Sequence, residues 1–176
     1  MGSTRLPNKV MKAIGGVPMI ELLLARLARS TELDQIIVAT STDPRNQVLA
    51  DHVRALGYAC ELGSENDVLD RFIKAGTIHG ADVVVRITGD CPLVDPALVD
   101  ECIRRFRLTE VDYFSNVSPP TYPDGLDIEV VKMAALVRAA QESDRDYDHE
   151  HVTPYVRESG CFSTAAMQNS EDLSGL

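Results

Sequence analysis

The first residues of the chain combine groups that suit phosphate binding. Gly2 and Ser3 let the backbone approach a ligand closely and offer N–H donors. Arg5 adds a planar guanidinium that matches phosphate oxygens, and Lys9 adds a mobile positive charge. The first acidic residue is Glu21, so this segment is wholly basic although the chain carries a net charge of -10. Two interpretations stay open: a local phosphate site, or a terminus whose charges are solvated.

A carboxylate follows the strongest strand pattern in the chain. Residues 81–88 read ADVVVRIT, and Asp90 comes next in a turn that Pro92 stiffens. An acid just past the end of a buried strand can hold Mg²⁺, which prefers oxygen ligands and keeps several waters. Asp90 is therefore the candidate metal ligand. The alternative is a turn aspartate that bonds only its own backbone.

A basic segment together with a metal-binding carboxylate suits metal-assisted attack on a nucleoside triphosphate. The common short phosphate motifs, GxxxxGK(S/T) and GxGxxG, are absent from the sequence. Their absence disfavours P-loop enzymes and dinucleotide dehydrogenases.

The elements that must position these residues alternate between strand and helix patterns. Apolar β-branched runs predict strands at residues 35–40, 58–62, 81–88, 111–115, 126–131 and 162–167. Helical spacing, proline starts and glycine stops predict helices at 18–30, 46–56, 67–79, 95–108, 133–142 and 148–158. Repeated β–α units predict a single three-layer α/β domain over residues 1–176 with a mostly parallel sheet. Residues 36–40 and 83–88 are expected to be neighbouring buried strands.

The composition argues against several classes of partner. The net charge of -10 and a pI near 4.8 argue against nucleic acid and against anionic membrane surfaces. No apolar run reaches the roughly 20 residues that a membrane span needs. The sequence also lacks a recognisable secretory signal, so we expect a cytoplasmic protein. The four cysteines fit no zinc spacing and are expected to be reduced thiols.

The order of these motifs resembles the sugar nucleotidyltransferases with a GT-A-like Rossmannoid fold. Within them it most resembles the cytidylyltransferase branch, which activates acylneuraminate and 3-deoxy-manno-octulosonate. The chain looks like the spore coat polysaccharide biosynthesis protein F subgroup of that branch, and the match covers nearly the whole chain. It rests on GSTRLPNK at 2–9, VATSTD at 38–43, GSENDVLDR at 63–71, VRITGDCPL at 85–93, YPDGLDIEV at 122–130 and EHVTPY at 150–155.

The resemblance implies cytidylyl transfer from CTP to a sugar acid, giving a CMP-sugar and pyrophosphate for surface or coat polysaccharide biosynthesis. Mg²⁺ is the implied cofactor with Asp90 as its ligand, and Lys9 and Asp90 are the implied catalytic residues. The implied nucleotide-binding residues are Gly2, Ser3, Arg5, Lys9, Ser41, Asp43, Ser64 and Arg71. The implied sugar-binding residues are Asp124, Asp127, Glu129 and His151, with His149 beside them. The resemblance is also compatible with a homodimer.

Other interpretations of the sugar-binding set stay open. Asp127 and Glu129 alternate on a strand, which fits a site and also fits a solvated sheet edge. His149 and His151 stand in an acidic run, where a charged loop that caps a helix is the alternative.

The chain departs from the family that it resembles at both ends. Family members carry a central strand before the position of Met1, and another acidic metal ligand on a strand beyond Leu173. We therefore expect a truncated domain that is weakly active or inactive by itself. One alternative is a non-catalytic fragment or interaction module of the same fold. Another is a GT-A glycosyltransferase, which usually carries an Asp-x-Asp motif, whereas Asp90 stands in Gly-Asp-Cys-Pro.

Overall fold

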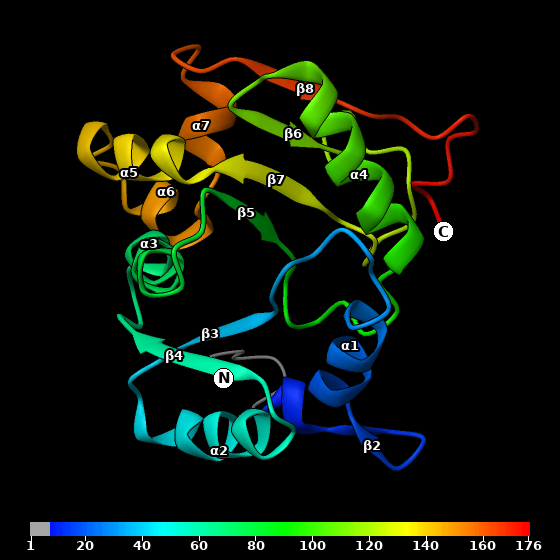
Figure 1. Ribbon diagram of the computed structural model, residues 1–176, viewed down its shortest axis with the longest axis vertical. Helices are drawn as coiled ribbons and strands as arrows, with labels where there is room; N and C mark the ends of the chain where they lie inside the picture. The colour runs from blue at the N-terminus through cyan, green and yellow to red at the C-terminus, as the bar shows by residue number, and fades with distance from the viewer. Residues whose placement is uncertain (1–7) are drawn as a thin grey trace.

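The computed structural model describes residues 8–176, so the predictions for Gly2, Ser3 and Arg5 lie outside the described residues. The elements are shown in Figure 1. In the first half they are η1 (Lys9–Met11), β1 (Ala13–Ile14), β2 (Val17–Pro18), α1 (Met19–Leu27), β3 (Ile37–Ser41), η2 (Pro44–Asn46), α2 (Gln47–Ala55), β4 (Ala59–Gly63) and α3 (Val68–Ile78). In the second half they are β5 (Val83–Arg86), α4 (Pro96–Thr109), β6 (Tyr113–Ser115), β7 (Glu129–Lys132), α5 (Met133–Glu142), α6 (Asp146–His151), α7 (Pro154–Glu158) and β8 (Thr164–Ala166).

Within the described part of the chain, the strands form two separate sheets and a short hairpin. β1 and β2 make the hairpin, and β3 pairs in parallel with β4. The larger sheet has the strand order β5-β7-β6-β8. In it β7 runs antiparallel to β5 and β6, whereas β8 runs parallel to β6. Parallel and antiparallel pairs are therefore mixed in this sheet.

The prediction of two neighbouring buried strands is wrong about their pairing and their burial. Within residues 8–176, β3 pairs only with β4, and β5 pairs only with β7. Val38 of β3 is half-buried, and Val83 of β5 is 40% exposed. An apolar β-branched run indicates that a segment suits a strand, but it carries no information about which strand lies beside it.

Alternate residues of β6 and β7 face two different cores. Phe114 and Val130 pack in the larger core with the apolar faces of α1, α2 and α4. Tyr113 and Val131 pack in the smaller core with α3, α5 and α7. This alternation is the period of two that a strand buried on both faces requires. Helices therefore cover both faces of the sheet, and the predicted three-layer α/β class is confirmed.

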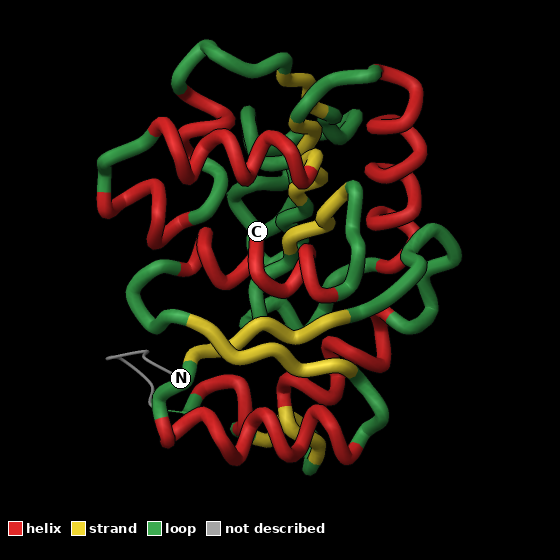
Figure 2. Tube along the Cα trace, turned by 60° about the vertical axis from the view of Figure 1, so that its left-hand side comes forward, coloured by secondary structure: helices red, strands yellow, loops and turns green. Residues whose placement is uncertain are grey.

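Helix α3 joins the two sheets. It contacts β3 and β4 on one side, and α5 and α6 on the other. Figure 2 shows the β3–β4 pair between helices on its two sides, with α2 opposite α3. The side chain of Asp67 caps α3 by accepting a hydrogen bond from the Asp70 N–H at 2.8 Å. The start of α3 is thus fixed just after β4.

The helix predicted over residues 148–158 is two helices. α6 ends at His151, and the next residue, Val152, has a φ of 75°, which lies outside the right-handed helical region. α7 begins at Pro154, which has no N–H to continue a helix but suits a first helical position. Helix α6 reads DYDHEH and has no apolar periodicity, so periodicity could not locate its boundary with α7.

Two expectations from composition can be compared with the structure. All four cysteines are free, and Cys161 alone among them is exposed. Among residues 8–176, no helix is both long and apolar enough to cross a bilayer.

Candidate active site

The structure brings Lys9 and Asp90 together although 81 positions separate them. Lys9 Nζ donates to Asp90 Oδ2 at 2.6 Å, and both side chains are partly exposed. Burial raises the pKa of Asp90, but hydrogen bonds from Lys9 and Thr88 outweigh it and hold the pKa below its ordinary value. Asp90 is therefore an ionised carboxylate paired with Lys9, the residue for which the sequence predicts a role in phosphate binding.

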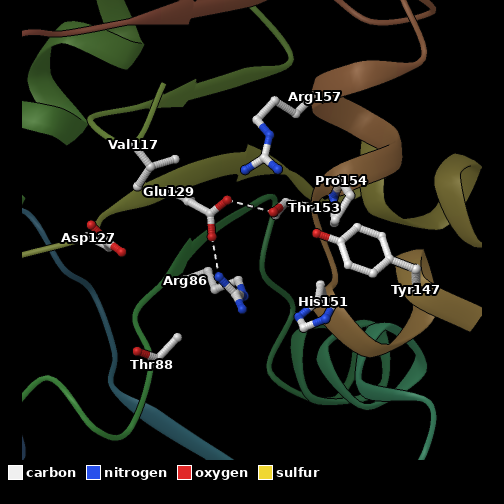
Figure 3. A pocket seen from close by; sticks show the side chains of 10 residues that line it. All are labelled: Arg86, Thr88, Val117, Asp127, Glu129, Tyr147, His151, Thr153, Pro154 and Arg157. Atoms are coloured by element: carbon white, nitrogen blue, oxygen red, sulfur yellow. Dashed lines mark hydrogen bonds and ion pairs between the residues drawn. The ribbon is translucent and has the colours of Figure 1, made fainter. Parts of the chain in front are cut away.

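A pocket of about 190 Å³ lies beside this ion pair, between β5, β7 and the helices α6 and α7 (Figure 3). Thr88 connects the two features because it lines the pocket and lies two residues before Asp90 in the chain. The lining residues are Arg86, Thr88, Val117, Asp127, Glu129, Tyr147, His151, Thr153, Pro154 and Arg157. The lining therefore combines arginines, a histidine and carboxylates, which suits a polar ligand that carries negative charge.

Glu129 forms the buried floor of the pocket and is only 3% exposed. Its Oε1 accepts hydrogen bonds from Tyr113 at 2.8 Å and from Thr153 at 2.6 Å. Its Oε2 pairs with the guanidinium of Arg86. A buried carboxylate is tolerated when its oxygens are paired in this way. Glu129 thus lines the pocket with both oxygens already bonded to protein side chains.

Asp127 lies at the pocket as a second, exposed carboxylate. Desolvation raises its pKa, and the charges of Asp124 and Glu129 raise it further, against a smaller lowering by Arg86. Asp90 is close enough to add to this effect. The structure therefore brings Asp124, Asp127 and Asp90 into one region where negative charge is incompletely neutralised.

These carboxylates suit a magnesium site that substrate phosphates and waters complete, rather than a site made by protein groups alone. Among the described residues, no three carboxylate, histidine or cysteine groups gather closely enough to hold a metal by themselves. Mg²⁺ is usually held by one or two carboxylates together with substrate phosphates and waters. Asp90, with Asp127 nearby, meets that requirement.

The loops after β3 and β4 meet, since the Thr42 N–H donates to the Gly63 carbonyl at 2.9 Å. Ser41 is buried, and its hydroxyl accepts from the Asn46 side chain at 2.5 Å. Asp43 caps η2, and its bonds from Arg45 lower its pKa to about 2. These contacts order the predicted nucleotide-side loop.

Arg71 reaches back from α3 over the end of β4. Its Nη1 donates to the Ser64 carbonyl at 2.7 Å. A Cβ at Gly63 would lie 3.0 Å from Arg71 Cγ, so this approach needs a glycine. Burial lowers the pKa of Arg71, and its Nε is buried with no hydrogen-bond partner among the described residues. Ser64 and Arg71 are therefore brought together at the end of β4.

The two histidines of α6 have different surroundings. His151 is exposed in the pocket and packs against the Tyr147 ring, with ring centroids 4.5 Å apart. His149 faces away from the pocket lining and bonds Asp67 of the α3 cap. Only His151 of the pair lies where a ligand in the pocket would contact it.

Sequence reasoning assigned no role to several pocket residues, namely Arg86, Thr88, Val117, Tyr147, Thr153, Pro154 and Arg157. Arg86 left a signal, because a cation at the end of the apolar run VVVR requires a buried or ligand partner. Thr153 and Arg157 left none, since helix α7 is placed by tertiary packing.

Curated relatives of the chain come from distant organisms. A Methanocaldococcus jannaschii protein described as uncharacterized is 40% identical over 158 residues, which are 90% of this chain and 64% of that protein. The spore coat polysaccharide biosynthesis protein SpsF of Bacillus subtilis is 35% identical over 162 residues, which are 89% of this chain and 66% of that protein. The chain thus spans just under two thirds of the length of these curated relatives.

A solved structure of a cytidylyltransferase from Leptospira borgpetersenii has the same architecture. It superposes with a TM-score of 0.94 at 29% identity and covers 99% of this chain, which corresponds to 75% of that chain. The sequence profile of the cytidylyltransferases matches residues 1–169, which include the Lys9–Asp90 pair and every residue that lines the pocket. The chain belongs to the cytidylyltransferase family.

Proposed function

We propose that the protein transfers the cytidylyl group of CTP to a hydroxyl of a sugar acid, with Mg²⁺, for surface or coat polysaccharide biosynthesis. The observation that carries the proposal is the Lys9–Asp90 ion pair, whose Asp90 lies two residues along the chain from Thr88 in the lining of a pocket that also contains Arg86, Arg157 and His151. Family membership and the likeness to SpsF support it. A cytoplasmic location and a homodimer belong to the same proposal, and sedimentation equilibrium of the purified protein tests the dimer.

Lys9 and Asp90 have different roles at the triphosphate of CTP. The Lys9 ammonium binds phosphate oxygens, and Asp90 holds Mg²⁺ with Asp127 nearby. When bound, Mg²⁺ neutralises charge on the phosphates. Positioning and charge neutralisation are the main contributions that a protein makes to phosphoryl-group transfer. The loops at Ser41–Asp43 and Ser64–Arg71 lie on the base and ribose side.

The acceptor occupies the pocket. Arg157 and His151 bind the carboxylate of the sugar acid, because both can carry positive charge and both face the same space (Figure 3). Arg86 is held by Glu129 in the floor, and Asp127 accepts hydrogen bonds from sugar hydroxyls. The acceptor oxygen forms a bond to the α-phosphorus in line as the bond to pyrophosphate breaks.

A pyrophosphate-release assay with CTP, Mg²⁺ and a panel of sugar acids tests the proposal. We expect release with CTP and a sugar acid, and much less with ATP, GTP or with the matching neutral sugars. The Asp90→Asn variant should fold and lose metal-dependent turnover, whereas Asp144→Asn, which replaces an acid outside the site, should retain it. Pyrophosphate release by Asp90→Asn at the wild-type rate would remove Asp90 as the metal ligand.

A further inference from the structure

His149 lies in α6 with both of its ring nitrogens hydrogen-bonded. Its Nδ1 is 2.8 Å from Asp67 Oδ2, and its Nε2 is 3.1 Å from the Ser143 carbonyl oxygen. A carboxylate and a carbonyl are both acceptors, so the ring satisfies both only by donating from each nitrogen. Only the protonated imidazolium does that. Consistent with this, the bonds to Ser143 and Asp67 raise the pKa of His149.

Asp67, the partner of His149, connects three parts of the nucleotide side. Its Oδ1 caps α3, and its N–H donates to the Ser64 hydroxyl at 3.0 Å. Its remaining oxygen, Oδ2, accepts from His149. The His149–Asp67 pair therefore joins α6 to the loop that carries Ser64 and to the helix that carries Arg71.

The His149–Asp67 pair also leads to the pocket, through helix α6. Helix α6 has six residues, and it contributes Tyr147 and His151 to the lining. Its buried Asp148 is paired with Arg145 at 2.7 Å and accepts from the Ser143 hydroxyl, but these contacts lie within the α6 segment itself. The bond from His149 to Asp67 spans 82 positions and ties α6 to another element.

We propose that His149 is a positioning residue that ties the pocket helix α6 to Asp67, so that the acceptor pocket and the nucleotide loop are held in one arrangement. This inference rests on the proposed function. His149 touches neither substrate in this assignment and acts through Tyr147 and His151. The longer α3 is anchored in the smaller core through Leu69, so loss of the tie should displace α6 and leave the nucleotide loop in place.

The tie should depend on pH with a defined sign. The charged groups that face the ring are Asp67 from the cap of α3 and Asp148 from α6, the latter with its partner Arg145. Both carboxylates favour the imidazolium. Because the folded pKa lies above the ordinary 6.5, the charged form of the tie is fully populated below that ordinary value and is lost as pH rises through the raised one, where the neutral ring can donate to only one of its two acceptors.

The test compares steady-state constants of the full chain as wild type, His149→Ala and Asp67→Asn. Asparagine keeps a capping oxygen for α3 but removes the charge that His149 binds. We expect the KM for the sugar acid to rise about tenfold in both variants, with the KM for CTP within about twofold of wild type. The acceptor KM of wild type should also rise with pH, and that of His149→Ala should not. His79→Ala is the matched control, because His79 pairs with Glu61 at 2.9 Å and does not line the pocket.

An unchanged acceptor KM in both variants, or an equal rise in His79→Ala, would overturn the proposal. If the wild type releases no pyrophosphate with any sugar acid, the proposed function fails. Hydrogen exchange of the α6 amides then tests independently whether the His149–Asp67 bond holds α6 in place. Faster exchange in His149→Ala than in wild type and His79→Ala supports it, and equal exchange in all three overturns it.

Discussion

At the scale of single residues, the site is built from charges that are neutralised by other protein charges. Lys9 neutralises Asp90, and Arg86 neutralises Glu129 in the pocket floor. The first pair is partly exposed, whereas Glu129 is buried and bonded at both oxygens. A ligand can therefore replace the partner of Asp90 far more readily than the partners of Glu129.

Replacement of Lys9 by alanine should weaken the binding of CTP in the presence of Mg²⁺. One charge-assisted hydrogen bond to a phosphate is lost, which should cost about 1.5–3 kcal/mol of binding free energy. Isothermal titration calorimetry measures the change, and Lys12→Ala serves as the control because Lys12 is an exposed neighbour. Equal CTP affinity in Lys9→Ala and wild type would remove Lys9 from the site.

The sequence predicted that Lys9 and Asp90 belong to one site, because charge and position after a strand are both properties of a residue and its neighbours, but it did not predict the ion pair between them. It did not predict the network at Glu129, which needs Tyr113, Thr153 and Arg86 from three different elements. Such contacts depend on tertiary packing, which no local pattern in a single sequence encodes.

At the scale of elements, periodicity and caps located the helices and strands well, with ends that differ by a few residues. The failures concern relations between elements. The break between α6 and α7 follows from the positive φ of Val152 and from Pro154. The proline could be recognised in the sequence as a helix start, whereas the φ of Val152 could not be predicted from it. The pairing of β5 with β7 rather than β3 joins segments that are distant in the chain. Local propensity indicates an element and leaves its partners open.

Gly63→Ala should disturb the junction of β4 and α3. The new Cβ would lie 3.0 Å from Arg71 Cγ and 3.3 Å from its Cα, so the helix or the strand must shift. Overpacking of this kind costs about 1–3 kcal/mol of unfolding free energy. Chemical denaturation measures it, and the KM for CTP should rise as Arg71 moves. Gly175→Ala, which meets open space, is the control. A Gly63→Ala protein as stable as wild type would show that the contact is relaxed at no cost.

At the scale of the whole molecule, the two sheets belong to one folded unit because helices pack between them. α3 packs against β3 and β4 on one side and against α5 and α6 on the other (Figure 2). Leu69 of α3 is fully buried in the smaller core, with Leu136 and Val156. The sheets should therefore unfold together through α3.

Leu69→Ala should destabilise the whole protein by about 2–5 kcal/mol, since it removes buried methyl groups and leaves a cavity. Thermal unfolding should stay a single transition at a lower midpoint. Leu108→Ala is the matched control, because Leu108 is 84% exposed on α4 and its replacement should change stability by less than about 0.5 kcal/mol. Two separate transitions in the wild-type protein would contradict the view of α3 as the connection between the sheets.

The ion pair of Lys9 with Asp90 has a thermodynamic consequence for the order in which ligands arrive. In the proposed assignment, free Mg²⁺ at Asp90 would displace the Lys9 ammonium without offering it a new partner, and CTP alone at Lys9 would leave the Asp90 carboxylate without a cation. The magnesium–nucleotide complex satisfies both at once. Mg²⁺ and CTP should therefore bind synergistically, each tightening the other by the same factor, as linkage requires. Titrations of each ligand with and without the other measure that factor, and it should shrink in Lys9→Ala, where no cation has to be displaced.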